Sequence, residues 1–224
     1  MKASLILGLF WLTAASVPSR AAQHSDRPRL SATQTPYLSC TVWNGHEWTQ
    51  PAAGSARTPV LQAPKGMRAY AEVKVVVDKG TCTNTTMLYI ANAVVEKTVY
   101  VKSGRGNGIN IIGWSPNGDQ LLAEVNLWQY ENGSGYEHVA ILYDVASEST
   151  IEIPELNHAL SEEFGSRCEF ERTIQGWKDD KQILVKVSQS PADGSHQQHS
   201  CVESPKTFLF NLQSKALRLY QAQP

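Results

Sequence analysis

The chain has 224 residues, of which 42% are hydrophobic and 18% are charged, and its formal net charge at pH 7 is −1. This length is enough for one domain with a substantial hydrophobic core. The charge is nearly balanced, and lysines and arginines are scattered along the chain. The composition therefore excludes the strongly basic surfaces of proteins that bind nucleic acid or anionic membranes, and we expect no nucleic-acid partner.

The N-terminus has the features of a secretory signal peptide. Lys2 supplies a positive charge, Leu5 to Ala15 form an apolar run of eleven residues, and Ser19-Arg20-Ala21 offer small residues at a cleavage site. The run is shorter than the roughly 18 apolar residues that a membrane helix needs, and no later segment approaches that length. The sequence therefore predicts a signal peptide at 1–21, a secreted or periplasmic location, and no membrane span.

The rest of the chain divides into a leader and one repetitive domain. Residues 22–36 are rich in Ser, Thr, Pro, Arg and Gln and lack apolar periodicity, which predicts a flexible leader. The remaining residues, 37–224, are expected to form a single β-repeat domain. Internal self-similarity divides this domain into three units at about 37–101, 102–154 and 166–220.

Each unit contains a turn followed by a β-rich run. The turn begins at Gly113-Trp114 in the second unit and at Gly176-Trp177 in the third, where it is one residue shorter. The copy in the first unit, Ala63 to Val73, is the most divergent of the three. Pro-Asn-Gly and Asp-Asp are typical turn residues. Because Trp114 and Trp177 occupy equivalent positions, we expect both side chains to lie in the core.

A second shared piece follows in every unit, after a variable insertion. A polar turn and a short alternating strand come after it, and alternation is typical of a strand with one buried face. The shared pieces are 87–92, 141–146 and 208–213, and the short strands are 97–101, 149–153 and 215–220. A further strand precedes the turn at 108–114 and 169–177. Each unit therefore holds about four strands with the spacing of antiparallel meanders.

One short helix is expected between the second and third units. Pro154 suits the start of a helix, and Gly165 suits its end. The residues between them, which include Leu156 and Leu160, provide an apolar side.

The repeated unit resembles a blade of the WD-repeat-like and TolB-like β-propellers. The residues that carry the resemblance are Gly-Trp-Ser-Pro-Asn-Gly at 113–118, the β run after them, and Leu-Tyr-Asp-Val at 142–145. In those families the turn joins the first two strands of a blade, and the Tyr-Asp piece lies in the third. The match is good over 108–153, fair over 168–220 and weak over 37–101. The blade pattern indicates the fold and says little about activity.

The resemblance implies an all-β fold of three propeller-like antiparallel four-stranded blades. Closed propellers have at least about four blades, so the three units form an open array or are completed by oligomerisation into a homo-oligomer. A shortened fourth blade around Ser39 to Gln62 is a further option. A β-sandwich is the alternative fold, because short strands with regular turns also suit that architecture.

Four cysteines remain after export, and an even number favours disulfide bonds in an oxidising compartment. The repeat positions favour Cys40–Cys82 and Cys168–Cys201, since each pair occupies corresponding places in the first and third units. A zinc site formed by His196, His199 and Cys201 is the alternative, but a fourth ligand is not evident. We expect no metal and no cofactor.

Aromatic residues beside loops give the only hint of a binding surface. Trp43 and Trp48 flank a hairpin-like tip, and Trp128 and Tyr130 lie two residues apart before a polar loop. Such residues form platforms for sugars or proteins, and packing between blades is the alternative explanation. Asn84 and Asn132 begin glycosylation sequons, which matter only if the source is a eukaryote.

No catalytic motif is evident in the sequence. Gly133-Ser134-Gly135 lacks the spacing of a nucleophile elbow, and Asp179-Asp180 is explained by a turn. The sequence therefore favours a non-catalytic extracytoplasmic module that contacts a protein or a glycan through loops at the blade edges. A glycosidase-like hydrolase, whose carboxylates would converge only in three dimensions, is the alternative.

Overall fold

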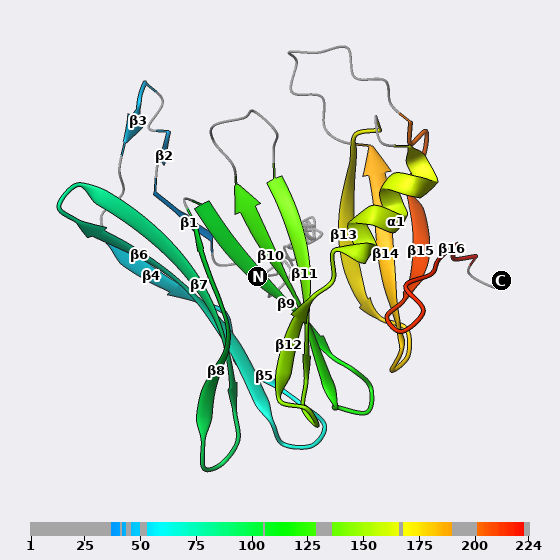
Figure 1. The fold of residues 1–224 in the computed structure, drawn as a ribbon, viewed down its shortest axis with the longest axis horizontal. Coiled ribbons are helices and arrows are strands. Elements are labelled where there is room, and N and C mark those ends of the chain that lie inside the picture. Colours follow the sequence, from blue (N-terminus) through cyan, green and yellow to red (C-terminus); the bar gives the residue numbers. More distant parts are fainter. Residues whose placement is uncertain are drawn as a thin grey trace, which may run out of the picture. The chain divides into compact units, whose positions relative to one another are not determined.

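The computed structural model describes residues 37–40, 42–43, 46–49, 53–104, 106–128, 136–165, 168–189 and 201–221. All of them belong to one compact unit, Ser31–Pro224. The predicted signal peptide and leader lie outside the described residues. Strands dominate, and most of them form three antiparallel sheets that follow one another along the chain (Figure 1).

The first sheet is built around a long hairpin. Its strands are β4 (Gly54–Arg57), β5 (Leu61–Gln62), β6 (Arg68–Asp78), β7 (Thr81–Ala91) and β8 (Glu96–Gly104). β4 and β5 both pair with β6, and the order continues through β7 to β8. Lys79 and Gly80 have φ values of 47° and 80°, a turn geometry whose twist suits a two-residue hairpin. The residues expected to form an insertion therefore extend the two strands instead.

The second and third sheets are simple meanders. The second has the strands β1 (Tyr37–Ser39), β9 (Gly106–Trp114), β10 (Gln120–Trp128), β11 (Tyr136–Asp144) and β12 (Ser149–Glu152), in that order. The third has β13 (Phe170–Trp177), β14 (Gln182–Gln189), β15 (Lys206–Asn211) and β16 (Leu217–Leu219). Helix α1 (Glu155–Phe164) connects the two sheets, with Pro154 before it and Gly165 after it, as predicted. A separate hairpin pairs β2 (Val42–Trp43) with β3 (Trp48–Thr49).

This arrangement confirms the predicted fold class, which is all-β with three propeller-like antiparallel four-stranded units. No sheet in the described part of the chain closes into a barrel. The described residues of Ser39 to Gln62 do not form the shortened fourth blade. Instead β1 adds to the second sheet, while β4 and β5 together take the place of the first strand in the first sheet.

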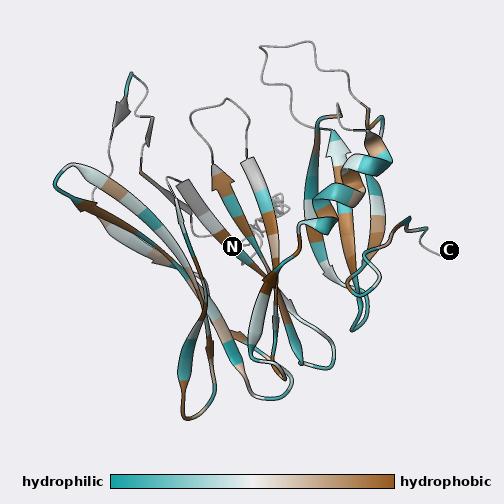
Figure 2. Ribbon diagram, viewed as in Figure 1, coloured by the Kyte–Doolittle hydropathy of each residue, from teal (hydrophilic) through white to brown (hydrophobic). Residues whose placement is uncertain are grey.

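Hydrophobic cores fill the spaces between successive sheets. The first core joins the first and second sheets and includes Leu88, Ile109 and Ile141. The second core joins the second and third sheets and also receives Leu156 and Leu160 from α1. Hydrophobic and hydrophilic bands alternate along this helix in Figure 2, as expected of a helix with one buried side. The second sheet is therefore covered on both faces.

The turns that precede β6, β10 and β14 are equivalent, because each is closed by the same kind of backbone hydrogen bond. These bonds run from Ala63 N to Met67 O (2.7 Å), from Ser115 N to Gln120 O (2.8 Å) and from Lys178 N to Gln182 O (2.8 Å). The turn of the first unit thus has the length of the third, one residue less than that of the second. It follows that Ala69, Leu122 and Leu184 occupy equivalent positions, each two residues after the acceptor.

The two repeat tryptophans follow matching β-bulges. Gly113 and Gly176 have φ values of 153° and 143°, and the register of each sheet shifts beside them. The prediction of a core position is confirmed for Trp114, which is buried in the first core. Trp177 packs against the second core with part of its surface exposed, so the core prediction is only partly correct there.

Two disulfide bonds join Cys40 to Cys82 and Cys168 to Cys201, which are the pairs that the repeat positions favoured. The Cα atoms are 5.6 Å and 5.7 Å apart, within the range that a disulfide requires. Among the described residues, no helix has the length and apolar character needed to cross a membrane.

Candidate functional site

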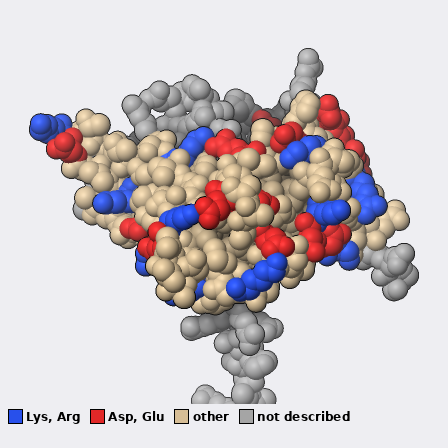
Figure 3. Space-filling view, turned by 60° about the horizontal axis from the view of Figure 1, so that its bottom comes forward, with Lys and Arg blue, Asp and Glu red and all other residues tan. Residues whose placement is uncertain are grey.

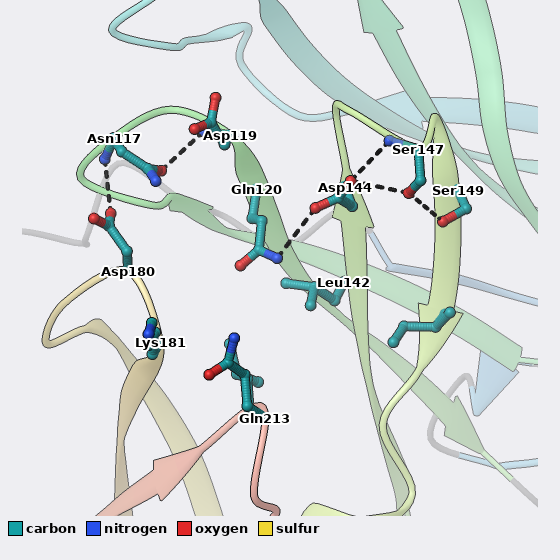
Figure 4. Close-up of a pocket in the computed structure, with 12 residues that line it drawn as sticks. Asn117, Asp119, Gln120, Leu142, Asp144, Ser147, Ser149, Asp180, Lys181 and Gln213 are labelled. Carbon is teal, nitrogen blue, oxygen red and sulfur yellow. Dashed lines mark hydrogen bonds between the residues drawn. The ribbon is translucent and has the colours of Figure 1, made fainter.

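A cleft of about 450 Å³ opens where turns of the second and third sheets meet, and we call it the turn-end cleft (Figure 4). Four turns or strand ends contribute to it, two from each sheet. The lining residues are Asn117, Asp119, Gln120, Leu142, Asp144, Ser147, Ser149, Ile151, Asp180, Lys181, Leu212 and Gln213. Most of them are polar, and they lie in turns or near the ends of strands whose central residues are apolar.

Asp144 is the most firmly held carboxylate of the turn-end cleft. Its Oδ1 accepts hydrogen bonds from the backbone nitrogen and the hydroxyl of Ser147, both at 2.9 Å. Its Oδ2 accepts one from Nε2 of Gln120 at 3.2 Å. These bonds, above all the one from the Ser147 backbone, hold the pKa of Asp144 below its usual value. Asp144 is therefore a fixed, ionised acceptor at neutral pH.

A second carboxylate joins the two sheets across the cleft. Asp180, in the turn between β13 and β14, accepts a hydrogen bond from the backbone nitrogen of Asn117 at 2.8 Å. The side-chain oxygen of Asn117 in turn accepts a bond from the backbone nitrogen of Asp119 at 3.0 Å. Asp119 forms an ion pair with Lys65 of the first unit. Consecutive repeat turns are thus linked to one another by their own turn residues.

The charges of the turn-end cleft favour a ligand that donates hydrogen bonds. Among the described lining residues, Asp144 and Asp180 stand against Lys181, while Asp119 is paired with Lys65. Leu142 and Leu212 supply apolar contact area on the cleft wall. On the face viewed in Figure 3, acidic and basic side chains are interspersed, so the acidic character belongs to the cleft and not to that face as a whole.

A separate buried network joins the second sheet, the helix and the third sheet. Arg172 forms an ion pair with Glu124, and both side chains are almost fully buried. The guanidinium also donates to Oδ1 of Asn157 at 2.7 Å and to the backbone carbonyl of His138 at 2.7 Å. Burial is the main cause that lowers the pKa of His138. The satisfied bonds of this network indicate a structural role.

Of the four aromatic residues proposed as ligand contacts, three are placed by their strands alone. Trp43 and Trp48 pair in the register of the β2–β3 hairpin, as the predicted tip requires, and Trp128 ends β10 opposite Tyr136. Their side chains, and all of Tyr130, lie outside the described residues. The proposed contact role of these four aromatics therefore stays a prediction.

The alternative zinc site is incompatible with the disulfide. Cys201 is bonded to Cys168 and has no thiolate to offer, while His196 and His199 lie outside the described residues. Within the described ranges, no group of three or more His, Cys, Asp or Glu side chains is placed to hold a metal ion. The sequon at Asn84 is also blocked in the folded chain, because its side chain is fully buried in β7.

The sequence alone indicates local structure, and no binding role, for the two carboxylates Asp144 and Asp180. Asp180 was assigned to a turn, and its neighbour Asp179 does cap that turn by accepting from the backbone nitrogens of Lys181 and Gln182. Asp144 was noted only as part of a strand piece. The available signal was the meander order, since the turn between the first two strands, which holds Asp180, and the end of the third strand, which holds Asp144, lie at the same end of such a sheet.

Comparisons of the chain with models of protein families, with curated proteins and with solved structures find no match.

Proposed function

We propose that the chain is a non-catalytic, extracytoplasmic interaction module that binds a protein partner through the turn-end cleft. The observation that carries the proposal is the fixed acceptor set of this cleft, in which Asp144 and Asp180 are held by turn and inter-sheet hydrogen bonds. Preorganised acceptors bind at a lower entropic cost than mobile ones.

A basic side chain of a protein partner fits the turn-end cleft best. Asp119 is paired with Lys65, and the remaining two carboxylates, Asp144 and Asp180, against Lys181 still favour a cation. A guanidinium or ammonium group supplies several donors at once. A glycan is the weaker ligand, because stacking on an aromatic ring is a usual part of sugar binding and the described residues of the cleft lining include no aromatic side chain.

A location outside the cytoplasm is supported by two features. Both disulfides are of the kind that oxidising compartments maintain. The predicted signal peptide at 1–21 has the charged start and short apolar run of an exported protein. Mass spectrometry of the exported chain is expected to find its N-terminus within a few residues of Ala22, and an intact Leu5 to Ala15 segment would contradict export by cleavage.

A hydrolase is the second candidate, because glycosidase chemistry uses a pair of carboxyl groups and three carboxylates line this cleft. That chemistry needs one carboxyl group with a raised pKa to act as the acid, and the pKa of Asp144 is shifted downward. Asp119 is paired with Lys65, and Asp180 accepts a bond from a backbone N–H, so these contacts favour the charged form of both carboxylates and support binding better than acid catalysis. Turnover of chromogenic glycosides by the wild-type chain, lost in Asp144→Asn, would reverse this preference.

The test uses defined probes and a matched control variant. The exported chain is titrated with a short arginine-rich peptide and with neutral oligosaccharides, and binding is followed by NMR. We expect the peptide to bind and its affinity to fall at least about fivefold in Asp180→Asn, with no change in Glu163→Gln on the exposed side of α1. Binding of an oligosaccharide alone, or of neither probe, would contradict the proposal.

A further inference from the structure

The face of the first sheet that points away from the second sheet is lined by every second residue of β6. The intervening residues Ala69, Ala71 and Val73 lie in the first core, and successive side chains of a strand point to opposite faces. β6 pairs with β7 over its whole length without a shift of register, so this alternation is unbroken. The outer side chains of β6 are therefore Arg68, Tyr70, Glu72, Lys74, Val76 and Asp78.

This outer face carries exposed apolar side chains. Val76 of β6 is 44% exposed, and Val101 of β8 is 56% exposed. Met87 of β7 lies opposite Val101 and is partly exposed. Neither hydrophobic core in the described part of the chain includes these three residues. The first sheet thus presents an open apolar surface on the side where no further sheet of the chain follows.

A stack of planar groups stiffens one end of the same face. The ring centroids of Tyr70 and Tyr89 are 4.7 Å apart, and the Arg57 guanidinium lies 3.7 Å from the ring centroid of Tyr70. The stack covers Tyr70 almost fully and leaves Arg57 and Tyr89 accessible. Interfaces are enriched in tyrosine and arginine, and rigid side chains lose little entropy when they are bound. The stack therefore suits a contact with another protein surface.

The outer residues of β6 are complementary to themselves when the strand is read in reverse. Val73 is the middle of the strand, and residues at equal distances on its two sides form pairs of opposite charge or an aromatic–aliphatic pair. The three pairs are Glu72 with Lys74, Tyr70 with Val76, and Arg68 with Asp78. A twofold axis that crosses β6 at Val73, in the plane between two facing copies, brings the members of each pair together across the interface.

The opposite end of the array has a different surface. The exposed residues of β13 and β14 on the outer face of the third sheet include Thr173, Gln175 and Lys186, all of them polar. A head-to-tail contact would cover these polar groups with the apolar face of the first sheet, and burying polar groups without partners is costly. Contact between two first sheets instead buries apolar surface on both copies, and it closes at two chains.

We infer that two copies of the chain form a dimer through the outer faces of their first sheets, related by this twofold axis. Glu72 of each copy then faces Lys74 of the other copy, and Val76 packs on the stack around Tyr70. Met87 lies opposite Glu72 and Val101 opposite Met87, so both are beside the axis and pack near their own counterparts. The turn-end cleft takes no part in this contact, so the dimer does not depend on the cleft binding a ligand.

Sedimentation of the exported chain tests the dimer and its charge pairs. We expect the wild type to form dimers, with a dissociation constant that rises at least about tenfold in Lys74→Glu and in Glu72→Lys, because each change places like charges together on both sides of the axis. Lys186→Glu on the third sheet is the matched control and should leave the dimer unchanged. Val76→Asp should also weaken the dimer, while Leu219→Asp, at a similarly exposed position of β16, should not.

A mixture of the two charge variants gives the decisive comparison. When a Lys74→Glu chain meets a Glu72→Lys chain, opposite charges face each other on both sides of the axis. We therefore expect the mixture to form heterodimers at concentrations where neither variant dimerises alone. The inference is overturned if the wild type stays monomeric up to about 1 mM, even where another protein binds this face. It is also overturned if the mixture stays monomeric, or if Lys186→Glu weakens the dimer as much as Lys74→Glu does.

Discussion

The indole nitrogen of Trp177 donates a hydrogen bond to the backbone carbonyl oxygen of Gly113, with a nitrogen–oxygen distance of 2.8 Å. Gly113 lies at the β-bulge of the second sheet, and Trp177 ends the first strand of the third, so the bond joins consecutive sheets beside the turn-end cleft. Trp114 holds the equivalent position one sheet earlier. Its indole nitrogen is buried and has no acceptor among the described residues. In the first sheet, Leu61 of β5 pairs with Ala69. Leu61 therefore takes the position that Gly113 has at the β-bulge of the second sheet.

Replacing each indole N–H by sulfur, with benzothienylalanine, tests this difference without changing the ring shape. At Trp177 the change leaves the Gly113 carbonyl without its donor, and we expect a loss of about 1 kcal/mol in the free energy of unfolding. At Trp114 the change removes a buried donor that has no partner, so stability is expected to stay the same or rise. Urea unfolding of both variants measures the contrast. Equal losses at the two sites would contradict it.

Removal of either disulfide is expected to destabilise the terminal unit that contains it. Cys40 and Cys82 are 42 residues apart in sequence, and Cys168 and Cys201 are 33 apart. Each bond closes a loop that restricts the unfolded chain, which raises the free energy of unfolding by about 3–4 kcal/mol. The two double alanine variants should therefore lose similar amounts of stability in urea unfolding under non-reducing conditions. Peptide mapping that finds Cys40 joined to Cys168 or Cys201 would contradict the pairing itself.

The strands and turns were predictable because their signals are local. Period-2 alternation marked the strands, and the Gly-Trp turn marked the start of each second strand, so the four-stranded units and the place of Trp114 followed from the sequence. The disulfide pairs followed from the same repeats. The interruption between β4 and β5 was not foreseen, since two short strands that share one partner leave no periodic pattern.

The turn-end cleft could not be predicted from the sequence, because it depends on how adjacent sheets stack. Asp144 and Asp180 come from different sheets, and only stacking brings them to one cleft. The side of a strand on which a residue lies decided whether a predicted modification site is accessible. Asn84 falls on the buried side of β7, which blocks its sequon, and a sequence motif does not contain that information.

The Asp144 carboxylate is expected to contribute stability at neutral pH that is lost in acid. Its pKa in the folded chain lies below the usual value of about 4, so the contribution is complete above that value and disappears as the pH falls through the lowered pKa. Asp144→Asn should therefore be less stable than the wild type at pH 7, by less than about 1 kcal/mol because the group is partly exposed. The difference should vanish well below pH 4 in urea unfolding.

The third sheet provides the control for this change. Asn211 holds the position equivalent to Asp144, and its Oδ1 accepts bonds from the backbone nitrogens of Gln213 and Ser214, both at 2.9 Å. An asparagine can thus keep the turn through its one oxygen, and Asp144→Asn removes the charge together with the acceptor for Nε2 of Gln120. A difference between Asp144→Asn and wild type that does not change with pH would show that the turn, and not the carboxylate charge, was lost.

The ion pair between Arg172 and Glu124 is expected to show strong coupling, because both side chains are almost fully buried. Arg172→Met leaves the Glu124 charge uncompensated and should lower the free energy of unfolding by about 3–5 kcal/mol. Adding Glu124→Leu removes that buried charge, so the double variant should recover most of the loss. Lys97→Met, which breaks the exposed pair with Glu148, should have little effect and serves as the control.

Urea unfolding of the four chains of the cycle gives the coupling energy. If the losses from Arg172→Met and Glu124→Leu simply add, the pair does not join the second and third sheets through charge, and the bonds from Arg172 to Asn157 and to the His138 carbonyl would then carry the stabilisation.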